Sequence, residues 1–222
     1  MSTWIDLSHP IADGDVPAKM PFLPNPTFRP IDDAALRATE VTIATHVATH
    51  LEAPCHLLDD GRSIDSYPAA HWIGTGIVAA VEAKSCEAID RADLELSRTP
   101  EAGEALLIHT GWEDLVGEER YLEPPYLSRS LASWIADQDV AWVGVDSPSP
   151  EMPSSMREAD PFTYPVHRTL FEAEIPIAEH LTNTGDVVGS IVEVIALPIR
   201  YVGADGAHAR IVARPVRETG SH

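Results

Sequence analysis

The stretch from residue 46 to residue 56 gathers the side chains best suited to chemistry. Three of the ten histidines of the chain fall within it, and a carboxylate lies between the second and the third. On a β-strand, side chains at even offsets share one face. Four candidates stand at even offsets from one another: His46, His50, Glu52 and His56. The β-branched residues at 41–45 favour a strand, and Pro54 indicates that it ends or lies at an edge. We therefore expect a strand that runs into a loop, with all four side chains on one face.

Such a face suits a divalent metal. Zinc binds neutral histidine nitrogen and carboxylate oxygen, and a catalytic zinc keeps one position open for water. His46, His50 and Glu52 would supply three ligands. His56 would then be a fourth ligand or a general base beside the bound water. The alternative is a polar strand face with ordinary solvated histidines.

His167 and Glu179 form a second candidate pair, separated by twelve residues. A short helix from residue 167 and a return strand over 176–179 could bring both to the same site. On spacing alone, His167 could equally cap a helix, and Glu179 could be an exposed acid. The loop at 146–150 follows a predicted buried strand, where ligand-facing loops often lie in α/β sheets; the alternative is a proline-rich turn.

Several familiar catalytic motifs are absent from the sequence. There is no Gly-x-Ser-x-Gly elbow, phosphate loop or dinucleotide fingerprint. A serine or cysteine nucleophile is therefore not indicated. Trp72 and Trp112 could line a pocket for a flat substrate, although core packing is the commoner fate of tryptophan.

Length and composition favour a single domain over residues 1–222. The net charge of −20, from 35 acidic and 15 basic residues, disfavours nucleic acids and anionic membranes as partners. The chain shows no apolar run of transmembrane length and no secretory signal. With only Cys55 and Cys86, a reduced, cytoplasmic location is expected.

Apolar runs predict strands that outnumber the helices. Strands are expected at 4–8, 75–82, 105–109, 140–145, 190–198 and 210–215. Helices are expected at 89–96, at 127–138 with Ser128 or Ser130 as the cap, and from 167. The proline-rich segment 13–30 reads as a long loop or arm, which would cover a site or reach a neighbouring subunit. The pattern predicts an α/β domain with a mixed β-sheet.

Residues 46–56 resemble the His-x-Gly-Thr-His-x-Asp-x-Pro-x-His signature of the cyclase family of metal-dependent hydrolases, which includes bacterial kynurenine formamidases and isatin hydrolases. Residues 107–112 are similar to the Leu-Ile-Arg-Thr-Gly-Trp segment of that family, and residues 143–149 to its Gly-Ile-Asp-Thr/Ser-Pro-Ser segment. Residues 166–183, 196–199 and 206–210 also resemble family segments. The resemblance covers nearly the whole chain in the family order.

The resemblance implies a role for each candidate. His46, His50 and Glu52 would bind a first metal, and Glu52 would bridge to a second metal held with His167 and Glu179. His56 would be the catalytic histidine. Zinc is the expected metal, up to two per chain, with manganese as the alternative. The family also implies a swivelling β/β/α fold and a homodimer or higher oligomer, in which the N-terminal arm contributes to the partner's site.

Two positions depart from the family signature. Ala48 replaces the family glycine, a small change if its φ is negative. Glu52 replaces the family aspartate and is one methylene longer. The longer side chain is expected to alter the metal–metal distance, the bridging mode or the metal preference.

The implied reaction is hydrolysis of a C–N amide bond. The metal would lower the pKa of a bound water, and His56 would pass the proton to the leaving nitrogen. N-formylkynurenine, giving kynurenine and formate, is the expected substrate. The alternatives are hydrolysis of a cyclic, isatin-like lactam, a cyclase-type dehydration of another carbonyl substrate, and a metal-dependent binding protein without turnover.

Overall fold

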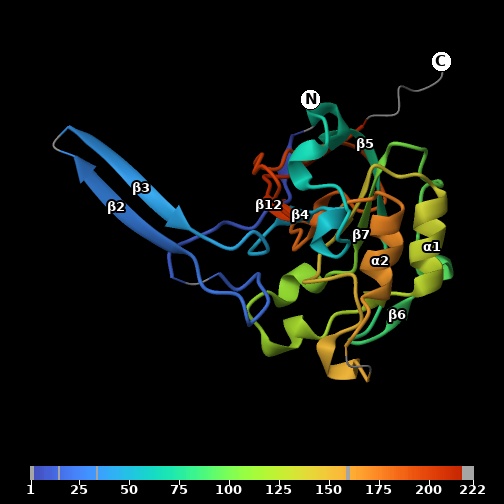
Figure 1. The fold of residues 1–222 in the computed structure, drawn as a ribbon. Coiled ribbons are helices and arrows are strands. Elements are labelled where there is room, and N and C mark those ends of the chain that lie inside the picture. The colour runs from blue at the N-terminus through green and yellow to red at the C-terminus, as the bar shows by residue number, and fades with distance from the viewer. Residues whose placement is uncertain (1–2, 15, 34, 159–160, 217–222) are drawn as a thin grey trace, which may run out of the picture.

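A nine-stranded sheet forms the body of the computed structural model, which describes residues 3–14, 16–33, 35–158 and 161–216 (Figure 1). From edge to edge its strands are β1 (Ile5–Asp6), β13 (Val212–Pro215), β11 (Ile191–Ile195), β5 (Ile73–Ala80), β7 (Ala105–His109), β9 (Trp142–Val145), β10 (Ile177–Glu179), β4 (His50–Glu52) and β12 (Gly206–His208). Strands β5, β7, β9 and β10 pair in parallel, whereas the remaining neighbours pair antiparallel. The predicted α/β class with a mixed sheet is confirmed.

Alternating side chains of the central strands fill two separate cores. In β7, Leu106 and Ile108 belong to the core beneath the helices, whereas Ala105 and Leu107 belong to the core on the opposite face. This alternation follows from the two-residue period of a strand. All four side chains are buried, because the strand is covered on both sides.

Two α-helices, α1 (Arg129–Asp137) and α2 (Pro165–Glu172), cover one face of the sheet and pack against each other (Figure 1). Helix α1 begins as predicted, because the Ser128 hydroxyl accepts a hydrogen bond from the Leu131 N–H at 3.0 Å. Leu131 and Ile135 of α1 and Leu170 and Phe171 of α2 are buried against the sheet. The predicted helix at 89–96 is wrong: it is reduced to a short 3₁₀ turn at Arg91–Asp93.

The remaining ordered elements are small. Strands β6 (Ala88–Ile89) and β8 (Tyr126–Leu127) pair in parallel beside α1. Short 3₁₀ turns occur at Pro54–His56, Ile64–Ser66, Ala69–Trp72, Arg91–Asp93, Trp112–Leu115, Glu119–Leu122, Ser154–Met156 and Thr184–Asp186. Among the described residues, no helix combines the length and apolar character needed to cross a membrane. The cytoplasmic location stays a prediction.

A two-stranded hairpin of β2 (Thr27–Asp33) and β3 (Leu36–Thr42) projects from the body (Figure 1). The sequence predicted an arm at 13–30 but not these strands. Apart from Phe28, which is half-buried, every described residue of the hairpin is exposed. With no buried face, the hairpin lacks the apolar alternation by which strands are recognised.

The strand expected from residues 41–45 onward is interrupted, although the extended chain does end near Pro54 as predicted. Strand β3 ends at Thr42, the chain then turns, β4 covers only His50–Glu52, and Pro54–His56 is a 3₁₀ turn. The turn before β4 places Ala48 at φ +56°, in the left-handed region that favours glycine. Replacement of the family glycine by Ala48 was expected to be a small change only if φ at this position were negative. Because φ is positive, that condition is not met.

Candidate metal centre and active site

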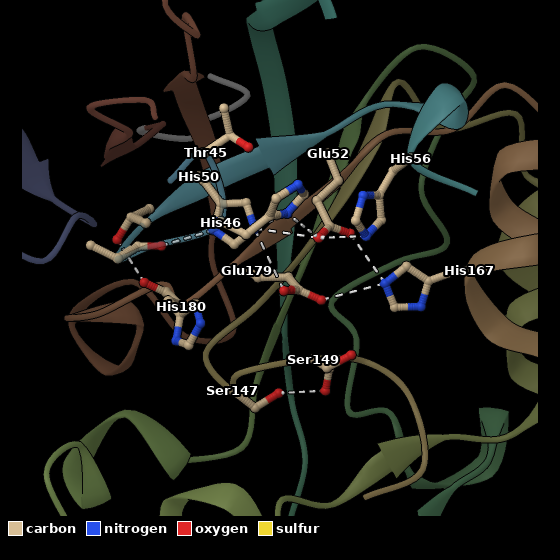
Figure 2. Close-up of polar contacts among 12 residues, drawn as sticks. Thr45, His46, His50, Glu52, His56, Ser147, Ser149, His167, Glu179 and His180 are labelled. Atoms are coloured by element: carbon tan, nitrogen blue, oxygen red, sulfur yellow. Dashed lines mark hydrogen bonds and ion pairs between the residues drawn. The ribbon is translucent and has the colours of Figure 1, made fainter. Parts of the chain in front are cut away.

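Strand pairing brings the two halves of the predicted site together. Strand β4 lies beside β10, and His50 is paired with Glu179 across the two strands. The intervening Leu51 and Ala178 point into the core on the face away from the helices. The side chains of His50, Glu52 and Glu179 therefore point to the helix-bearing face. The first turn of α2 places His167 over the same point (Figure 2).

The first cluster consists of His46, His50 and Glu52. The Nδ1 atom of His46 lies 2.8 Å from Oε1 of Glu52 and 3.1 Å from Nε2 of His50. The Nδ1–H of His50 donates to the Ala48 carbonyl at 2.8 Å, so its Nε2 carries the lone pair that faces the cluster. One ligand atom from each residue lies within 4.8 Å of the others, as a shared metal requires.

The second cluster consists of Glu52, His167 and Glu179, all of them buried. The Oε2 atom of Glu52 lies 3.1 Å from Nε2 of His167, and Oε1 of Glu179 lies 3.5 Å from the same nitrogen. The two carboxylate oxygens of Glu52 thus face different clusters (Figure 2). This is the geometry that a bridging ligand needs, although the ligand roles themselves stay predictions.

Glu151 orients His167 and was missed in the sequence. Its Oε1 accepts the backbone N–H groups of Val166 and His167 at the start of α2, at 2.7 and 2.9 Å. The same oxygen lies 3.3 Å from Nδ1 of His167, which turns Nε2 toward the second cluster. Such outer contacts fix the orientation of metal-binding histidines. Because Glu151 lies sixteen residues before His167, no local pattern joins them.

The electrostatics of the clusters favour a bound cation. Burial opposes the charge of Glu52, but its hydrogen bonds with His167, His46 and His50 hold its pKa well below the usual value. Burial likewise opposes the charge of His167, yet Glu151, Glu179 and Glu52 raise its pKa well above normal. For His46, Glu52 and Asp205 outweigh burial and raise the pKa to about 9.

Among the described residues, every ion-pair partner of Glu52 and Glu179 is a histidine. The carboxylates therefore attract a positive charge that only protons on the imidazoles or a metal can supply. Neutral imidazole and carboxylate are the ligands that zinc prefers among nitrogen and oxygen donors. The residues present fit a divalent metal.

His56 lies at the edge of the clusters and is partly exposed, with 36% of its side chain accessible. Its Nε2 is 3.8 Å from Oε1 of Glu52, and its Nδ1 is 2.9 Å from Oδ2 of Asp205. The predicted catalytic histidine therefore lies on the 3₁₀ turn Pro54–His56, not on β4, and contacts the clusters from that turn. Asp205 was not singled out in the sequence, because 149 residues separate it from His56.

A cavity of about 340 Å³ opens onto the clusters. His46, Glu52, His56, His167 and Glu179 all line it. Its other walls come from the arm, the end of the 3₁₀ turn after β4, the loop after β9 and the segment before α2, with Met20, Phe22, Leu23, Leu57, Pro148, Ser149, Arg157 and Tyr164. The interpretation of 146–150 as a ligand-facing loop is thus supported for Pro148 and Ser149.

Trp72 and Trp112 do not line this cavity. Both are buried, and the Trp112 indole N–H donates to the Tyr121 carbonyl at 3.0 Å. Core packing, the commoner of the two fates considered for these residues, accounts for both.

A separate group of potential ligands, His109, Glu113 and Asp146, shares no residue with these clusters. The Asp146 carboxylate accepts the N–H groups of Thr110 and Gly111. Glu113 accepts those of Thr184 and Gly185, and His109 lies 2.8 Å from the Thr184 hydroxyl. These contacts join loops to one another, so we interpret the group as structural.

Known proteins resemble this chain over almost its whole length. The sequence pattern of the family described as Putative cyclase matches residues 5–152. A kynurenine formamidase from Bacillus cereus is 28% identical over 217 residues, covering 97% of this chain and 99% of that protein.

Two solved structures show the same fold. The match to a structure described as a potential metal-dependent hydrolase with cyclase activity covers 98% of this chain and 100% of that chain. Its TM-score is 0.79 and the sequence identity is 22%. The match to isatin hydrolase A from Labrenzia aggregata covers 97% of this chain and 94% of that chain, with a TM-score of 0.82 and 19% identity. These likenesses confirm the predicted fold.

Proposed function

The chain belongs to the Putative cyclase family, and from that premise we propose that it is a metal-dependent hydrolase of C–N amide bonds. One observation carries the proposal: the oxygens of Glu52 face two histidine–carboxylate clusters on the wall of a cavity that also holds His56. The 28% identity to a kynurenine formamidase supports the same reaction class.

Each side chain has a distinct part in this proposal. The first cluster would hold one ion and the second cluster another, with Glu52 shared; zinc fits the donors best, and manganese is the alternative. When bound, the metal supplies a Lewis acid and lowers the pKa of water. The Nε2 of His56 faces the first cluster, so this nitrogen is placed to accept a proton and return it to the leaving nitrogen.

The cavity wall favours an aromatic substrate that carries a carboxylate. Met20, Phe22 and Leu23 supply an apolar side, whereas Arg157 is the only lysine or arginine among the described lining residues. The Arg157 Nε donates to the Met152 carbonyl at 2.9 Å, and its guanidinium carbon lies 5.1 Å from the ring centroid of Tyr164. A held cation and an apolar wall in one cavity fit N-formylkynurenine, an aryl formamide with an amino-acid carboxylate, better than uncharged isatin.

This substrate assignment is tested with metal-loaded protein and three compounds: N-formylkynurenine, uncharged formanilide and isatin. We expect the highest kcat/KM for N-formylkynurenine. Arg157→Gln should raise its KM about tenfold or more, because a charge-assisted hydrogen bond contributes about 1.5–3 kcal/mol, and should leave the KM of formanilide unchanged. Arg157→Lys, which keeps the charge, is the matched control.

Other results would redirect the assignment. Faster turnover of isatin than of both formamides would favour the lactam hydrolase. Bound metal with no turnover of any amide would favour the metal-dependent binding protein.

We also propose that the chain is a homodimer held in part by the β2–β3 hairpin. Ile31 and Leu36 are 49% and 75% exposed on the hairpin, and an isolated two-stranded hairpin is marginally stable in water. Met20, Phe22 and Leu23 line the cavity, and the hairpin begins soon after them in the chain, at Thr27. Sedimentation velocity should give a dimer mass that falls toward the monomer in the double variant Ile31→Ser, Leu36→Ser. A monomeric wild-type protein at micromolar concentration would rule this dimer out.

A further inference from the structure

Asp205 joins two histidines that have different tasks. It lies immediately before β12, and its Oδ2 is 2.8 Å from Nε2 of His46 and 2.9 Å from Nδ1 of His56. The other oxygen, Oδ1, lies 3.3 Å from the Thr45 hydroxyl, which can donate to it. A single carboxylate oxygen therefore contacts both imidazole rings.

For His46, this contact determines which nitrogen faces the first cluster. Its Nδ1 points toward Glu52 and His50, so with Nδ1 bound to a metal the opposite nitrogen, Nε2, would carry the proton that Asp205 accepts. A carboxylate behind a metal-binding histidine fixes the tautomer, orients the ring and makes the ligand nitrogen more basic. Loss of such an outer partner typically weakens metal binding by about 10–100-fold.

For His56, the same oxygen fixes the nitrogen that is available for proton transfer. The Nδ1–H donates to Asp205, which leaves the lone pair on Nε2, 3.8 Å from Oε1 of Glu52. The rings of His46 and His56 lie 4.2 Å apart at their centroids, with a 34° tilt. Rotation of either ring would break its contact with Asp205.

We propose that Asp205 is a positioning residue that couples metal binding at His46 to proton transfer at His56. The part concerning His56 rests on the proposed hydrolase function, whereas the part concerning metal affinity does not need a substrate. The competing role is that Asp205 is itself a metal ligand, because His46, His56 and Asp205 also place ligand atoms within 4.8 Å of one another. The nitrogen of His46 that faces Asp205 is, however, the one turned away from Glu52 and His50.

The test compares Asp205→Asn, which keeps the size without the charge, and Asp205→Ala with the control Asp65→Asn. Asp65 accepts the Gly203 N–H at 2.8 Å and the Ser63 hydroxyl at 2.7 Å, so it holds the same loop but contacts neither histidine. Zinc affinity is measured by chelator competition, stoichiometry at saturating zinc, and kcat and KM separately. Circular dichroism checks that each variant is folded.

We expect both Asp205 variants to raise the zinc dissociation constant about 10–100-fold with unchanged stoichiometry. At saturating zinc they should lower kcat more than they change KM, because substrate binding does not involve Asp205. In a double-mutant cycle, Asp205→Asn should lower kcat no further in the His56→Ala background. Asp65→Asn should leave affinity and rate unchanged.

Three results would overturn the proposal. Loss of one zinc per chain at saturation would make Asp205 a ligand. Equal losses of zinc affinity and kcat in Asp65→Asn would show that Asp205 only holds the loop. Unchanged affinity and kcat in Asp205→Ala would remove it from the site. If no amide is hydrolysed by the wild-type protein, the proposed function fails, and the affinity measurements still decide the role of Asp205 toward His46.

Discussion

Replacement of Glu52 by alanine is expected to remove the metal and the hydrolytic activity together. One oxygen of Glu52 lies 2.8 Å from His46 in the first cluster, and the other lies 3.1 Å from His167 in the second. Truncation therefore removes a carboxylate oxygen from both clusters at once. Metal content after dialysis, measured by mass spectrometry, and the initial rate of N-formylkynurenine hydrolysis should fall in parallel.

Glu193→Ala is the matched control for this experiment. Glu193 lies in β11 and pairs with Arg214, so the variant also loses a paired glutamate from a strand of the same sheet. It should keep both metal and activity. Full metal occupancy in Glu52→Ala would refute the bridging position of Glu52, and loss of one ion of two would restrict Glu52 to a single cluster.

The parts of the fold that are governed by local patterns were predictable from the sequence. The apolar run at 105–109 is β7, because a strand buried on both faces needs such a run. Ser128 caps α1 as expected, because capping depends on contacts within one turn. The β2–β3 hairpin was missed for the complementary reason: with almost no buried side chains, it carries no periodic apolar signal.

The four candidates between residues 46 and 56 were identified by an argument that the structure only partly supports. Even spacing assumed one strand, yet only His50 and Glu52 lie on β4, whereas His46 comes from a turn and His56 from a 3₁₀ turn. The strand aligns only His50 and Glu52, and bends in the chain bring His46 and His56 to them. Ala48 at φ +56° is part of that bend, which spacing does not reveal.

Long-range partners were beyond the reach of spacing. The pairing of His50 with Glu179 depends on the register of β4 against β10, and only the family resemblance had connected these residues. Asp205 was missed because it lies far from His46 and His56 in the sequence. The pairing of β12 with β4 brings it next to both histidines. Tertiary pairing, rather than local propensity, completes the site.

Replacement of His56 by alanine should lower kcat by about 10²-fold or more while the metal is retained, from the usual size of acid–base contributions. His56 stands outside the first and second clusters, and its Nε2 lies 3.8 Å from Oε1 of Glu52. Removing it therefore takes away the proton carrier and leaves the five candidate ligands in place. Metal content and kcat at saturating substrate are measured on the same sample.

His71→Ala provides the comparison, because His71 packs against Tyr67 and Trp72 and does not line the cavity. Its kcat should match that of the wild type. Unchanged turnover in His56→Ala would exclude His56 from proton transfer. Loss of metal in that variant would instead make His56 a fourth ligand, the alternative that the spacing of residues 46–56 had left open. The two measurements together therefore distinguish the two roles that an imidazole at this position can have.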